Sequence, residues 1–149
     1  MADIKGMKEL LAKLKKLGKE GEESIAVVTE VVAKQIEGSA KLKAPVDLGK
    51  LRQDIVAVKV DNLNWKIYAN YSGLTPYSAY QEFGTGGLVD LTYLTEAGYP
   101  VSVAERFKGA SQDRVNLPAQ PFLFPAYLEG RVQYIEELKK ELEFLTNGV

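Results

Sequence analysis

Two carboxylates, Asp47 and Glu82, are the side chains of this 149-residue chain best suited to acid–base chemistry. A carboxylate pair hydrolyses a glycosidic bond when one member acts as the acid and the other as base or nucleophile. A small carboxylate-dependent hydrolase acting on a polysaccharide is therefore one hypothesis. The simpler interpretation makes Asp47 a cap for the turn Leu48–Leu51, and makes Glu82 a partner for Arg52 or for the glycine N–H groups that follow it.

Histidine and cysteine are both absent from the chain. Their absence excludes Ser-His-Asp and Cys-His nucleophile systems and any disulfide framework, and it removes the commonest metal ligand. Only hard oxygen ligands remain for a metal ion. We therefore predict no catalytic, cofactor-binding or metal-binding residues and favour a protein that is not an enzyme.

The glycine-rich run over residues 84–87, Gly-Thr-Gly-Gly, invites comparison with phosphate-binding loops. It lacks both the Gly-Lys-Ser/Thr ending of a P-loop and the Gly-x-Gly-x-x-Gly spacing of a dinucleotide site. Because a helix commonly ends on a glycine with positive φ, Gly84 is better explained as a helix stop.

A short aromatic helix is predicted just before this run. Tyr77, Tyr80 and Phe83 recur at the i, i+3 spacing that places side chains on one helical face. Pro76 suits the first helical position and Thr75 the N-cap. The aromatic side chains are therefore expected to anchor the segment in the core.

Composition is that of one globular domain spanning residues 1–149, with 46% hydrophobic and 26% charged residues. The formal net charge of −1 does not indicate the positive stripe that a DNA-binding accessory protein needs. No apolar run approaches the roughly 20 residues that span a bilayer, and no signal peptide is evident, so we expect no membrane association.

Apolar periodicity predicts the framework of the fold. Residues 1–20 contain an amphipathic helix, residues 22–42 a second helix that ends before Pro45, and residues 126–145 a C-terminal helix with Pro125 at its first position. Alternation over residues 55–60 and 65–69 indicates an antiparallel hairpin. The expected class is α+β, with long N-terminal helices, a small antiparallel β-sheet and a C-terminal helix packed on the sheet.

Residues 84–121 are harder to assign. Short strands are predicted over Leu88–Leu94 and Tyr99–Ala104, so the segment is either a long irregular loop or a hairpin excursion. Its many apolar side chains predict that the part from Gly86 to Asn116 is ordered chiefly by neighbouring subunits and forms the main assembly surface. The candidates for that interface are Leu88, Val89, Leu91, Tyr93, Leu94, Tyr99, Val101, Val103 and Phe107.

Three motifs occur in order along the chain: Ala-Pro-x-Asp-x-Gly-x-Leu-Arg from Ala44, Tyr-x-x-Tyr-x-Glu-Phe-Gly-Thr-Gly from Tyr77, and Pro-Ala-x-Pro-Phe-x-x-Pro-Ala from Pro118. Together they resemble a small neck or tail-completion family of tailed bacteriophages, the tail-component family of HK-type lambdoid phages. Leu48 and Phe124 stand where that family commonly has Thr and Arg. The motif positions are Pro45, Asp47, Gly49, Leu51, Arg52, Tyr77, Tyr80, Glu82, Phe83, Gly84, Thr85, Gly86, Pro121, Phe122, Pro125 and Ala126.

The resemblance implies a structural virion protein at the joint between head and tail, assembled in the host cytoplasm. It implies a homo-oligomeric ring, a hexamer first and a dodecamer second, around a channel through which DNA passes as cargo. The implied partners are other neck and tail proteins, with no cofactor.

Overall fold

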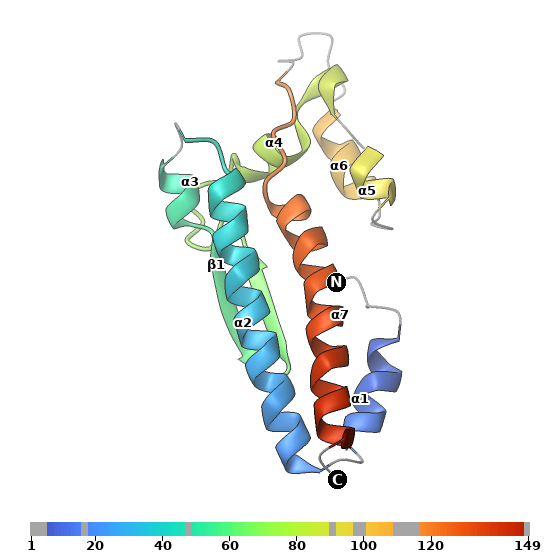
Figure 1. Cartoon of the computed structure of the whole chain (residues 1–149). Coiled ribbons are helices and arrows are strands. Elements are labelled where there is room, and N and C mark those ends of the chain that lie inside the picture. The colour runs from blue at the N-terminus through green and yellow to red at the C-terminus, as the bar shows by residue number, and fades with distance from the viewer. Residues whose placement is uncertain are drawn as a thin grey trace.

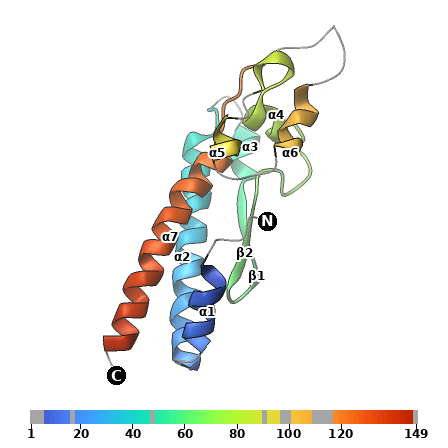
Figure 2. The same ribbon diagram turned by 90° about the vertical axis from the view of Figure 1, so that its right-hand side faces the viewer.

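The structure is a computed structural model that describes residues 6–15, 18–46, 49–89, 92–96, 101–108 and 117–147. Two long helices, α2 (Lys19–Lys43) and α7 (Leu123–Asn147), lie side by side, and a β-hairpin covers one side of α2 (Figures 1 and 2). The short helix α1 (Met7–Lys15) lies beside the end of this pair where α2 begins and α7 ends. The remaining short helices gather at the opposite end. The predicted α+β class is confirmed.

Helix α2 provides the centre of the core. Its buried positions recur every three or four residues and include Ile25, Val32, Ile36 and Ala40. Helix α2 begins at Lys19, earlier than predicted, directly after Gly18, whose φ of 84° is not helical. It ends before Ala44, which takes the extended conformation that a following proline favours.

Two further apolar side chains of this helix lie outside the buried face. Val27 and Val31 are 62% and 49% exposed. Helix α2 therefore buries a single stripe and leaves a second apolar stripe on its solvent side.

The hairpin consists of β1 (Val56–Asp61) and β2 (Asn64–Tyr68), paired antiparallel with Ala57 opposite Ile67. Asp61 closes the turn by accepting the Leu63 N–H at 2.8 Å. A two-stranded hairpin is marginal alone. Its inner face packs on α2, where Ile67 joins the main core and Ala57 is buried.

Helix α7 packs along α2 in the region of the sheet. A Cβ at Gly130 would collide with the Ile36 side chain, so glycine lets the two helices approach closely. The Tyr134 and Thr29 hydroxyls share a hydrogen bond of 2.8 Å between the two helices. Helix α7 begins at Leu123, so Pro125 lies in its first turn rather than at its first position, where its missing N–H still costs no helical bond.

The regular elements in the described part of residues 84–121 are short helical turns, not strands. They are η1 (Gly86–Leu88), α5 (Thr92–Glu96), α6 (Ser102–Glu105) and η2 (Arg106–Lys108), while α3 (Gly49–Gln53) and α4 (Ser78–Phe83) precede them. The predicted strands and the hairpin excursion are wrong there. Ala104 and Phe107, three residues apart, both turn toward Phe83, so helical spacing decided the local structure.

No helix within the described ranges is long and apolar enough to cross a membrane.

Candidate functional site

Asp54, just after the first motif, and Thr75, just before the second, join the two segments that carry these motifs. The Thr75 hydroxyl donates to Asp54 Oδ2 at 2.6 Å, and the Ser72 N–H donates to Oδ1 at 2.7 Å. The Thr75 bond, supported by Ser72, holds the pKa of Asp54 below its ordinary value against the effect of burial. Thr75 is therefore not the N-cap of α4: Tyr77 occupies that position without a side-chain capping bond.

The second and third motifs meet through Glu82. Its carboxylate is 3% exposed and accepts the N–H groups of Phe122 and Leu123 at 2.9 Å and of Phe124 at 3.0 Å. These are free donors at the start of α7, where a negative charge also complements the helix dipole. Burial raises the pKa of Glu82 above its ordinary value, and the three N–H bonds oppose that rise.

The three bonds that Glu82 accepts at the start of α7 were not among those predicted for it. Arg52 donates to the Ala44 carbonyl at 3.0 Å and so holds the end of α2. The three donors to Glu82 lie about 40 residues further along the chain. The sequence did hold a signal for this contact. The first turn of α7 has no acidic residue of its own, so its N–H groups need an acceptor from elsewhere in the chain.

The glycine run packs against the third motif. Gly84 has the predicted positive φ, 73°, and a Cβ there would lie 2.8 Å from the Ala119 nitrogen. Beside it, the Thr85 N–H donates to the Leu117 carbonyl, and the Leu117 N–H donates to Thr85 Oγ1, both at 2.9 Å. The run therefore tolerates a close backbone approach, and it is not a phosphate cradle.

The three aromatic residues of the short helix do not share one environment. Tyr77 packs on the main core, whereas Phe83 stacks on Phe107 with ring centroids 5.3 Å apart. Tyr80 is 45% exposed and meets Phe107 edge-on. Phe124 contacts Phe83 at 5.6 Å, so the aromatic that replaces the family's common Arg joins this second cluster.

Most of the remaining motif residues lie in the main core or at the starts of helices and turns. Leu51, Phe122 and Ala126 are buried together in the main core, beside the end of α2 that precedes Pro45. Gly49 opens α3, Gly86 opens η1 with a φ of 63°, and Pro121 precedes the capped start of α7. Asp47 lies outside the described residues.

The predicted interface residues are divided. Val89 and Phe107 pack beside Phe83 on the chain itself, Val101 is half-buried, and Leu88 is 48% exposed. Leu91 and Tyr99 lie outside the described residues, as do the side chains of Tyr93, Leu94 and Val103. The described part of the segment thus has an anchor within the chain, and its role in assembly stays a prediction.

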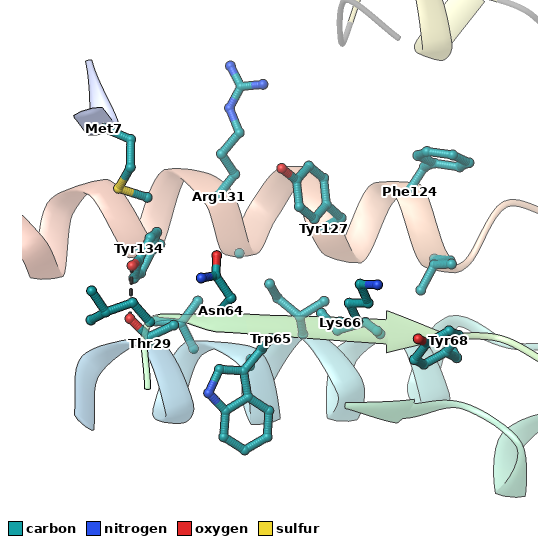
Figure 3. A pocket seen from close by; sticks show the side chains of 17 residues that line it. Met7, Thr29, Asn64, Trp65, Lys66, Tyr68, Phe124, Tyr127, Arg131 and Tyr134 are labelled. Carbon is teal, nitrogen blue, oxygen red and sulfur yellow. Dashed lines mark hydrogen bonds between the residues drawn. The ribbon is translucent and has the colours of Figure 1, made fainter. Parts of the chain in front are cut away.

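An apolar groove runs between α7 and β2, with α2 as its floor (Figure 3). Its volume is about 460 Å³. Val32, Ala33 and Ile36 line it from α2, and Tyr127 and Tyr134 line it from α7. Sequence reasoning missed this groove, because its walls come from segments far apart in the chain.

Residues 8–84 match the sequence model of the phage family described as "Bacteriophage HK97-gp10, putative tail-component". The chain belongs to this family. The match begins in α1 and ends at Gly84, so it includes the first motif, most of the second, and the Asp54–Thr75 bond between them. Comparisons with curated proteins and with solved structures found no match.

Membership of this family makes the chain a virion-associated tail component with a structural role. The site geometry agrees with that role, because the motif residues described above join segments to one another. Among the described residues, no cluster of three or more acidic side chains could hold a metal ion. Both Glu82 oxygens accept bonds from the α7 N-terminus, which gives this carboxylate a structural task.

Proposed function

We propose that this tail component is a ring subunit at the joint between the phage head and tail, where it completes the tail around the DNA channel. The observation that carries the proposal is a pair of separate exposed apolar regions at the same end of the molecule. A closed ring with head-to-tail contacts needs two different, complementary surfaces on each subunit.

The first region lies at the end of α2, beside α3. Leu42 is 82% exposed in the last turn of α2, and Val46 is 75% exposed just after it. Side chains of this size are costly to leave in water, and an exposed apolar group marks a contact surface.

The second region belongs to the glycine run and the third motif. Leu88 and Leu117 are 48% and 43% exposed, and Tyr80 lies nearby on α4 at 45%. Figure 1 shows α3 at one side of the wide end and α5 and α6 at the other. A ring contact that places the end of α2 of one subunit against residues 86–117 of the next covers both regions.

A hexamer is the first choice for the ring and a dodecamer the second. The six-fold axis expected for the tail favours the hexamer, and the partners above and below are other neck and tail proteins. DNA passes through the channel as cargo, and assembly takes place in the host cytoplasm before the subunit enters the virion. The role is met by complementary surfaces, without catalysis.

The test is a charge placed in one region. Leu42→Asp is expected to abolish ring formation by purified protein, as measured by mass photometry, because the carboxylate would be buried without a partner. Val60→Asp is the matched control, since Val60 is also exposed, at 54%, but lies on β1. Rings that persist in Leu42→Asp, or are lost equally in both variants, would argue against this surface.

Hydrogen exchange supplies a second test. Residues 86–89 and 101–108 are expected to gain protection when the ring forms, beyond the protection that the Phe83–Phe107 contact already gives. Exchange that is unchanged between the monomer and the assembled particle would remove this segment from the interface.

A further inference from the structure

The strand β2 has an open edge. Ala57 lies opposite Ile67, and the Ala57 N–H donates to Glu37 Oε2 at 2.8 Å instead of to β2. Antiparallel pairs alternate between hydrogen-bonded and non-hydrogen-bonded, so the Ala57–Ile67 pair is of the second kind. The Lys59–Trp65 pair, two residues along, is of the same kind. The backbone N–H and C=O groups of Trp65 and Ile67 therefore point away from β1.

The two edges of the hairpin are treated differently. Glu37 covers the β1 edge, and its carboxylate is fixed there by Lys41 at 2.6 Å. Within the described parts of the chain, the Trp65 and Ile67 N–H groups have no acceptor. An uncovered edge of this kind is a template for pairing with another strand.

The open edge faces the apolar groove. Figure 3 shows β2 running along the groove with α7 on the side away from β1. The volume of about 460 Å³ lies within the range of roughly 300–1,000 Å³ that is usual for binding pockets.

The charges around the groove have one sign. Lys66 and Arg131 are the charged side chains among the lining residues, and no carboxylate joins them. Neither forms an ion pair with any residue in the described ranges. A ligand with an apolar face and carboxylates on the other face would match both the floor and the rim.

We propose that this groove binds an extended, acidic segment of a partner polypeptide, which adds to β2 as a third strand. Its backbone pairs with Trp65 and Ile67, its apolar side chains face α2, and its carboxylates lie beside Lys66. Strand addition of this kind draws affinity from main-chain bonds and specificity from alternate side chains. A third strand also stabilises a hairpin that is marginal with two.

A second copy of the same hairpin fits the groove poorly. Edge-to-edge pairing of two β2 strands that uses Trp65 and Ile67 places Lys66 opposite its own equivalent, and like charges directly opposite are destabilising. The inference is independent of the ring contact, which uses other surfaces.

The probe is an acetylated nine-residue peptide that alternates valine and glutamate, added to full-length protein. Amide exchange measured by NMR is expected to slow by at least about tenfold at Trp65 and Ile67. Lys66 and Tyr68 are expected to stay unchanged, because their N–H groups already bond to β1. This alternation distinguishes strand addition from adhesion to the apolar floor.

Two charge variants test the acidic component. Lys66→Glu is expected to weaken binding of the peptide by about tenfold, whereas Lys50→Glu, an exposed position on α3 outside the groove, leaves it unchanged. A peptide with lysine in place of glutamate is expected to bind the native protein at least tenfold more weakly.

Several outcomes would overturn the proposal. The first is a failure of the peptide to bind saturably at millimolar concentration. The second is slowed exchange at Lys66 and Tyr68 as well as at Trp65 and Ile67. The third is protection of the Trp65 and Ile67 amides in dilute protein before any peptide is added. Protection that appears with self-association alone would assign the groove to a second copy instead.

Discussion

The Thr75 hydroxyl donates a 2.6 Å hydrogen bond to the Asp54 carboxylate, and both residues are buried. This bond connects the turn after α3 to the segment that leads into α4, across 21 residues of sequence. It lies within the region that matches the tail-component family, so it belongs to the part of the fold that the family shares.

We predict that this bond makes an acid-sensitive contribution to the free energy of unfolding. The native pKa of Asp54 lies below its ordinary value of 3.8, so its contribution is complete above that value and is lost as the pH falls through the native pKa. Thr75→Val is expected to lose less stability than the native protein between pH 7 and pH 3, as measured by urea unfolding. Thr75→Ser keeps the hydroxyl and is expected to show the same dependence of the unfolding free energy on pH as the native protein. An equal pH dependence in all three proteins would show that the bond makes no acid-sensitive contribution.

Removal of the Glu82 carboxylate is expected to destabilise the start of α7. Glu82→Ala leaves three buried or half-buried N–H groups without their acceptor, at a cost of about 1–3 kcal/mol. Glu129→Ala is the control on the same helix, because its carboxylate is 63% exposed and pairs with Lys43 at the surface. Chemical denaturation at pH 7 measures both changes, and a similar small effect in the two variants would refute the capping role.

Two glycines separate backbone strain from close contact. Gly73 and Gly84 both have positive φ, but only at Gly84 would a Cβ meet neighbouring backbone. Gly73→Ala is expected to cost about 1–2 kcal/mol, from left-handed geometry alone. Gly84→Ala should cost clearly more, because the third motif must also move. Thermal unfolding of the pair gives the comparison, and equal losses would mean that residues 117–119 do not pack tightly on Gly84.

The contact between α2 and α7 is testable in the same way. Gly130→Ala forces the Ile36 side chain aside and is expected to cost about 1–3 kcal/mol, which outweighs the helix propensity gained. Gly38→Ala has open space around it within α2 and is expected to stabilise by about 0.4–1 kcal/mol. The double variant Gly130→Ala, Ile36→Val should recover part of the loss. No recovery would place the strain elsewhere.

The long elements could be predicted because their patterns are repeated many times. The stripe from Ile25 to Ala40 fixes α2, and alternation around Ala57 and Ile67 fixes the hairpin. The starts of α2 and α7 were predicted about three residues late, since one glycine or one proline decides them locally. The turns between Gly86 and Lys108 are only three to five residues each, too short for period to separate helix from strand.

The motif residues were named from the sequence, but the bonds that join their segments were not. Gly84 was assigned correctly from a property of glycine itself, its positive φ. The partners of Glu82 and Thr75 were not, because a carboxylate or hydroxyl carries no sequence mark of the distant donor that it will meet. The open β2 edge was missed for a similar reason, because it depends on which of the two hairpin edges Glu37 reaches.

Cryo-electron microscopy of the intact virion tests the central claim most directly. The account predicts a closed ring around the DNA channel at the head–tail joint, with six copies or alternatively twelve. Each subunit should show the α2–α7 pair and the hairpin. The end of α2 of one copy should contact residues 86–117 of the next. A chain found along the tail shaft, at the distal tip or outside the joint, or present as an isolated monomer, would contradict the account.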